Sequence, residues 1–188
     1  RDGDCFLLHW SDGNAPERHM LVDGGRSGTY SHLRPRLVDI VNAGEALELL
    51  LLTHIDADHI EGSLKYLRDE AIPIVPRRVW YNGYDQMDGI QSLSFKQGDD
   101  YSKRLDELGW ALNQEVGRGP VCIETAPAPI DIVGLSLHGL SPDLAHLKTL
   151  RDAWDDWRTA DAIKEAAKKR REDAAAAGVQ IMGRKPMP

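Results

Sequence analysis

The chain has 188 residues, and 23 lysines and arginines against 30 aspartates and glutamates give it a formal net charge of −7 at pH 7. This length suits one globular domain, and 41% hydrophobic with 28% charged residues is typical of a chain with a buried core. The excess of acid argues against a generally basic nucleic-acid-binding surface, and no apolar run approaches the roughly 20 residues of a membrane span. Cys5 and Cys122 lie far apart, so we expect neither a disulfide framework nor a thiolate zinc site, and we expect a cytoplasmic location.

Short apolar runs of strand length recur through the first 140 residues, and residues that favour turns flank each of them. The third run is apolar at consecutive positions, which predicts a strand that is covered on both faces. The six predicted strands span residues 5–10, 19–23, 47–53, 78–81, 121–124 and 132–140.

Apolar residues at helical spacing lie between these runs and predict three helices. The first helix follows a Ser31 cap and accommodates Pro35 only if that residue lies in its first turn. The apolar positions of the three helices are Leu33, Leu37, Ile40 and Val41, then Ile60, Leu64 and Leu67, then Tyr101, Leu105, Leu108 and Leu112. Because strands and helices alternate, the sequence indicates an α/β fold.

After Pro142 the apolar residues are spaced three, four and six apart, which predicts one or two amphipathic helices over residues 143–177. Trp154 and Trp157 are expected to pack this segment onto the sheet. Basic residues at 164–171 are matched by acidic ones nearby, which favours a solvated helical face over a phosphate-binding surface. Gly178 is a candidate helix stop, so we expect a domain at 1–142, a helical segment at 143–177 and a loop or processed end at 178–188.

The segment most informative about chemistry is residues 53–62, which read Thr-His-Ile-Asp-Ala-Asp-His-Ile-Glu-Gly. Four candidate metal ligands fall within six residues of it, between the buried strand and the next helix: His54, Asp56, Asp58 and His59. Alternate positions of an extended loop project to one side, and imidazole with carboxylate suits zinc, manganese or iron. The alternative interpretation is that these residues cap the helix or form a turn, as single Asp and His residues often do.

This segment resembles the HxHxDH motif of the metallo-β-lactamase fold superfamily, with Asp56 in place of the middle histidine. The form T-H-x-D-x-D-H-x-x-G is similar to that of the hydrolase domain of bacterial competence DNA-uptake proteins (ComEC-like) and of related hydrolases in bacterial defence gene clusters. Further segments resemble motifs of the same group and extend the resemblance over about three quarters of the chain: GDCFLL at 3–8, LVDGG at 21–25 and LSP at 140–142.

The resemblance implies an αββα sandwich that binds two divalent metal ions, zinc or manganese. In it His54 and Asp56 would hold the first ion, and Asp58 and His59 the second, with Asp58 also contacting the bridging water as a catalytic residue. Asp23 would orient the loop from beneath by hydrogen bonding, although a strand-end turn is an equally good interpretation of this residue. The implied activity is that of a phosphodiesterase or nuclease that uses a metal-bound hydroxide.

The chain lacks the TGD and HHG signatures that supply the remaining ligands in the family. Its later histidines are expected to be structural, His138 in a core strand and His146 on a helix, and Arg77 and Arg78 are weak candidates for phosphate contacts. The resemblance therefore implies the amino-terminal half of the fold with a helical C-terminal insertion, completed by a second polypeptide or a missing C-terminal half.

The resemblance also implies a role in bacterial defence, with nucleic acid as substrate and activation through cleavage by a partner protease. A noncatalytic regulatory or scaffold subunit that keeps the fold is the alternative function. Hydrolysis of a small thioester or lactam is a third function that the same loop permits.

Overall fold

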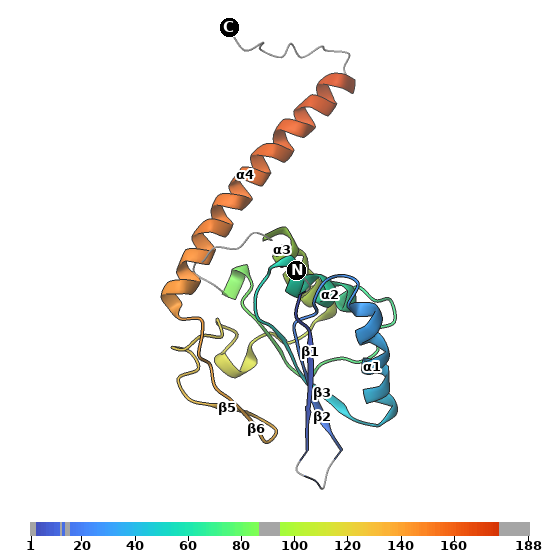
Figure 1. The fold of residues 1–188 in the computed structure, drawn as a ribbon. Helices are drawn as coiled ribbons and strands as arrows, with labels where there is room; N and C mark the ends of the chain where they lie inside the picture. Colours follow the sequence, from blue (N-terminus) through green and yellow to red (C-terminus); the bar gives the residue numbers. More distant parts are fainter. Residues whose placement is uncertain (1–2, 12, 14–15, 87–94, 177–188) are drawn as a thin grey trace. The chain divides into compact units, whose positions relative to one another are not determined.

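The computed structural model of this chain describes residues 3–11, 13, 16–86 and 95–176. Its larger sheet has four strands in the order β1-β2-β3-β4. Strands β1 and β2 are antiparallel, whereas β2, β3 and β4 run parallel to one another (Figure 1). The strands lie close to the first four predicted runs, and the mixed α/β class is confirmed: β1 (Phe6–Trp10), β2 (Arg18–Val22), β3 (Ala46–Leu52) and β4 (Val79–Tyr81).

Strand β3 lies inside the sheet and is buried on both faces, as its four consecutive leucines at residues 49–52 predict. Leu49 contributes to a core cluster on one face, together with Met20 and Trp80. Leu50 points to the opposite face because side chains alternate along a strand, and helices pack on β3 there. Both leucines are fully buried, and burial of each such side chain stabilises the folded state by about 1.5–3 kcal/mol.

Helix α1 begins one residue before the predicted cap. Its cap residue is Thr29, and the hydroxyl of Ser31 donates to the carbonyl of Gly28 instead of capping the helix. Pro35 is therefore the sixth residue of the helix, outside the first turn, and its exposed position accommodates the missing hydrogen bond. The helices before residue 110 are α1 (Tyr30–Asn42), α2 (Ala57–Leu67) and α3 (Phe95–Leu108), with short 3-10 helices η1 (Tyr84–Gln86) and, later in the chain, η2 (Gln114–Val116).

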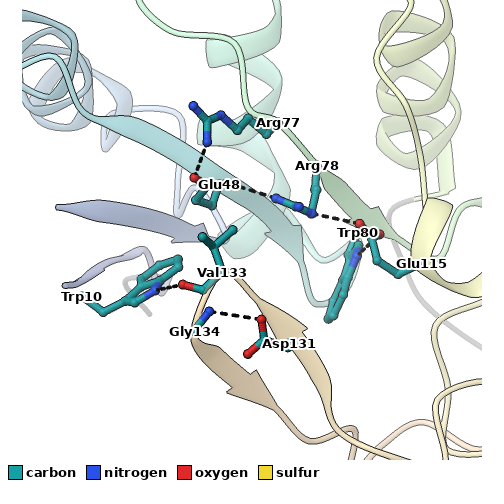
Figure 2. Close-up of polar contacts among 9 residues, drawn as sticks. All are labelled: Trp10, Glu48, Arg77, Arg78, Trp80, Glu115, Asp131, Val133 and Gly134. Carbon is teal, nitrogen blue, oxygen red and sulfur yellow. Dashed lines mark hydrogen bonds and ion pairs between the residues drawn. The ribbon is translucent and has the colours of Figure 1, made fainter. Parts of the chain in front are cut away.

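The prediction of one strand at residues 132–140 is wrong, because this stretch belongs to a hairpin of two shorter strands. Val133 and Gly134 both have a positive φ, 51° and 88°, which gives the two-residue turn that joins tightly paired strands. The indole of Trp10 donates to the carbonyl of Val133 at 3.1 Å and ties the turn to strand β1 (Figure 2). The two strands of this hairpin are β5 (Ile130–Ile132) and β6 (Leu135–Leu137).

The predicted strand at residues 121–124 is also wrong, since this segment forms turns. The hydroxyl of Thr125 donates to the carbonyl of Pro120 at 2.6 Å and accepts from the backbone N–H of Cys122 at 3.1 Å. These local bonds satisfy backbone groups that a strand would have left to a neighbouring strand.

Arg77 and Arg78 are bound by carboxylates rather than placed at the mouth of the predicted site. The buried carboxylate of Glu48, near the start of β3, accepts from Arg77 at 2.6 Å and from Arg78 at 2.9 Å (Figure 2). Arg78 also pairs with Glu115 at 3.0 Å, and Glu115 accepts from the indole of Trp80. Because the predicted loop lies at the other end of β3, these arginines are structural ion pairs.

The chain divides into two compact units, residues 1–154 and 155–188. Within the first unit Trp154 is fully buried against Phe95 and Gly98 of α3. Helix α4 (Leu144–Ala176) continues through the described part of the second unit, where residues 162–169 are exposed as predicted for a solvated face. The predicted loop at 178–188, with Gly178, lies outside the described residues, and no helix that is described has the length and apolarity to cross a membrane.

Candidate metal centre

The predicted ligand loop lies where two parallel strands end side by side. Residues 53–56 connect β3 to α2, and Asp23 directly follows the neighbouring strand β2. The backbone N–H of Asp23 donates to the carbonyl of Leu51 at 2.8 Å, which extends the ladder to this point. Carboxyl ends of parallel strands meet at one edge of a sheet, and this edge is where ligand sites form in α/β proteins.

Three glycines let the backbone close tightly around the loop. A Cβ at Gly24 would lie 2.0 Å from the backbone nitrogen of Ser63, and a Cβ at Gly62 would lie 1.9 Å from the carbonyl oxygen of Gly24. A Cβ at Gly3 would similarly collide with the carbonyl of Asp58. These glycines belong to three of the sequence motifs, so the motifs are packed against one another.

Asp23 is a hydrogen-bonding centre of the loop. Its Oδ1 accepts from the backbone N–H of Thr53 at 2.8 Å, and its Oδ2 accepts from the Thr53 hydroxyl at 2.7 Å and lies 2.8 Å from His59 Nδ1. The residue is 2% exposed and adopts φ 58°, a conformation that Asp tolerates better than most residues. Both oxygens are engaged, so Asp23 orients the loop and has little capacity left to ligate a metal ion.

The same carboxylate sets the tautomer of both loop histidines. A carboxylate only accepts hydrogen bonds, so His59 presents its Nδ1–H to Asp23. The single hydroxyl proton of Thr53 also goes to Asp23, which leaves Thr53 Oγ1 as the acceptor for Nδ1–H of His54, 2.8 Å away. In the neutral rings both Nε2 atoms then carry the lone pair that a metal ion requires.

The structure brings the two histidines and Asp23 together. Their ligand atoms lie within 4.8 Å of one another, and the ring centroids of His54 and His59 are 3.8 Å apart. Asp56 Oδ2 lies 3.9 Å from His54 Nε2, too far for a hydrogen bond but near the separation of about 3–4 Å between two atoms that ligate one ion.

Neither Asp56 nor Asp58 caps helix α2 with its side chain, although the sequence allowed that interpretation. Asp56 occupies the cap position of α2, but its side chain makes no capping hydrogen bond. Asp58 lies in the first turn of α2, half-buried, and has no hydrogen-bond or ion-pair partner within the part of the chain that the structure describes. Asp58 does not belong to the group of Asp23, His54 and His59 whose ligand atoms are close together.

The two later histidines are both exposed, which corrects the prediction of a core position for His138. His138 follows strand β6 and lines a cavity of about 220 Å³ beside the loop. His146 lies in the first turn of α4, where its Nδ1 is 2.8 Å from Asp143 Oδ1 and its backbone N–H donates to the same oxygen. These bonds tie His146 to Asp143 at the start of α4.

The cavity opens at the ends of β3 and β4 and is mainly apolar. Leu51 and Thr53 line it from the sheet, and Leu137 and His138 line it from the hairpin side. Asn82 forms part of its wall and is fixed by two bonds to the backbone of residue 121, at 2.9 and 2.8 Å.

Cys5 lies near the centre but is not a thiolate. Burial, followed by the negative charge of Asp23, raises the pKa of the Cys5 thiol to about 11. The thiol therefore stays protonated at neutral pH when no metal ion is bound beside it.

Neither a model of a known protein family nor a curated protein matches this chain. Sequence reasoning missed the role of Thr53, whose hydroxyl links Asp23 to His54. The available signal was its position between the buried strand and the first histidine.

Proposed function

We propose that this chain contributes the metal-binding loop of a metal-dependent hydrolase, a phosphodiesterase or nuclease of the metallo-β-lactamase type. The single observation that carries the proposal is the role of Asp23, which directs the Nε2 atoms of both His54 and His59 away from itself and leaves them free to ligate. A carboxylate behind a metal-binding histidine is the usual way that proteins fix such a ligand.

The residues present suit a divalent ion of the zinc or manganese class. His54 with Asp56 would hold one ion, and Asp58 with His59 would hold a second. When bound, such ions act as Lewis acids on the scissile group and acidify a water molecule. Asp56 in place of the usual middle histidine makes the first site harder, which favours manganese more than an imidazole-rich site does.

The arrangement of helices and strands in layers supports the same proposal. Helices α1 and α2 cover one face of a mixed sheet, and the β5–β6 hairpin packs on the other (Figure 1). We infer that this arrangement is half of an αββα sandwich, and that a second polypeptide or further chain completes it and supplies the remaining ligands.

The chain's own residues would orient the substrate beside the loop. The cavity at the ends of β3 and β4 is of a size and polarity to take an apolar or planar group, with His138 at its rim. Because Thr53 lines this cavity and also bonds to His54, a group bound there lies directly beside the proposed metal ligands. A nucleobase next to its phosphodiester meets this description.

The experiment is a hydrolysis assay of the natural protein on single-stranded and duplex DNA, after removal of metal and addition of Mn²⁺ or Zn²⁺. We expect chelator to abolish activity and Asp58→Ala to lower it at least about 100-fold. Asp39→Ala, an exposed position of α1, is the matched control and should retain activity. Hydrolysis that survives chelation contradicts the proposal, and protein without bound metal after reconstitution supports the scaffold alternative.

A further inference from the structure

A second group of histidine and glutamate side chains lies at the opposite end of the sheet. His9 and His19 are direct partners in the antiparallel register of β1 and β2. Glu17 directly precedes β2, and Glu45 directly precedes β3, the parallel neighbour of β2. The length of β3 separates this cluster from the loop at residues 53–59 by roughly 20 Å.

The four side chains are already close to one another. His19 Nε2 lies 2.7 Å from Glu45 Oε2, and His9 Nδ1 lies 2.9 Å from Glu17 Oε2. The two imidazole rings are stacked with centroids 6.1 Å apart. Ligand atoms of Glu17, His19 and Glu45 lie within 4.8 Å of one another, so three of the four residues meet at one point.

Burial argues that the His19–Glu45 pair is more than a surface ion pair, whereas His9 and Glu17 lie at the exposed side of the cluster. His19 is 8% exposed, and the carboxyl of Glu45 beside it is only partly accessible. Two carboxylates and two neutral imidazoles carry a charge of −2, which a divalent cation neutralises. Without a metal ion, exposed ion pairs such as His9–Glu17 contribute little to the free energy of folding.

We propose that Glu17, His19 and Glu45, with His9 as the fourth ligand, form a zinc-binding site distinct from the predicted catalytic loop. Two nitrogens and two oxygens are a ligand set suited to tetrahedral zinc, and four protein ligands make a closed, structural site. Zinc takes the place of the hydrogen between the histidine nitrogen and the glutamate oxygen in each pair, while the imidazole proton moves to the other ring nitrogen. Each neutral histidine then offers a lone pair, and the ion clamps the β1–β2 hairpin to the turn before β3.

The test uses protein whose loop has been disabled by His54→Ala together with Asp58→Ala, so that its result does not depend on the hydrolase proposal. Calorimetric titration with Zn²⁺ alone should find one zinc equivalent in this background. Adding His19→Gln, which keeps a hydrogen-bonding side chain, should remove that equivalent. Zinc should also raise the unfolding temperature of the background protein but not of the His19→Gln variant.

His9→Gln is the second variant, at a mostly exposed position where folding is not at risk. It should weaken zinc binding about tenfold or more, whereas the control His146→Gln, an exposed histidine paired with Asp143, should change nothing. Circular dichroism checks that each variant is folded. A background protein that binds no zinc, or zinc binding that is unchanged in folded His19→Gln and His9→Gln variants, overturns the proposal.

Discussion

The backbone at Gly24, directly after the Asp23 turn, touches Gly62 of helix α2 with no space for a side chain on either residue. Gly62 N–H donates to the carbonyl of Gly25 at 2.9 Å, and the N–H of Gly24 donates to the carbonyl of His59 at 2.8 Å. This contact holds the strand that carries Asp23 against the helix that carries His59. Asp23 and His59 can therefore meet only because residues 24 and 62 are glycines, which have no Cβ atom.

Gly62→Ala should lower the free energy of unfolding by about 1–3 kcal/mol, because the new methyl group collides with backbone that has no rotamer to change. Urea denaturation followed by circular dichroism measures this loss. Gly28→Ala is the matched control, since nothing lies within 4 Å of the Cβ that it adds. Equal stability of the Gly62 and Gly28 variants would show that the helix can move away from Gly24 at no cost.

Asp23→Asn should weaken binding of Mn²⁺ or Zn²⁺ by about 10–100-fold while leaving most of the fold intact. Asparagine fits the same space and tolerates φ 58°, but it has one acceptor oxygen for three donors. The tautomers of His54 and His59 are then no longer fixed together. Calorimetric titration measures the change, with Asp39→Asn on α1 as control, and an unaltered affinity would remove Asp23 from any role in metal binding.

Asn113→Ala should lower the free energy of unfolding by about 2–4 kcal/mol. The amide of Asn113 is fully buried, bonds to both the N–H and the carbonyl of Tyr81 at 3.0 and 2.8 Å, and donates to Gly119. Alanine leaves these backbone groups without partners and also disfavours φ 48°. Thermal and urea unfolding test this against Asn42→Ala, an exposed position at the end of α1, which should lose far less.

Asp69 should make the protein sensitive to acid. Hydrogen bonds from the Tyr30 hydroxyl, the backbone N–H of Ala71 and the Arg34 guanidinium lower the pKa of its carboxyl from 3.8 to about 2. A carboxyl whose pKa is lower in the folded state stabilises the protein above its unfolded pKa. This stabilisation is therefore present above about pH 4 and is lost as the pH falls to about 2.

The measurement is urea denaturation at pH 7, 4 and 2 for the wild type and Asp69→Asn. The variant should be less stable at pH 7, and the difference should shrink between pH 4 and pH 2. A difference that stays constant over this range would assign the loss to packing and not to the charge of Asp69.

Sequence pattern by itself determined the strands and helices that are held by local periodicity. The leucines of residues 47–52 predicted a doubly covered strand, and that strand is β3. Pattern failed where a two-residue turn reversed the chain, at Val133 and Gly134, because a turn with two positive φ values leaves no mark on apolar periodicity. It also failed at residues 121–124, where Thr125 bonds locally to the backbone.

The identity of the candidate ligand loop was likewise available from the chemistry and spacing of residues 54–59. Only the tertiary structure decided that Asp23, thirty residues before Thr53, sets the tautomer of His59 directly and that of His54 through Thr53. Only it stacked His9 on His19 and brought His19 beside Glu45. The physical reason is that side-chain type and spacing are local properties of the chain, whereas hydrogen bonds between strand ends depend on which strands become neighbours in the sheet.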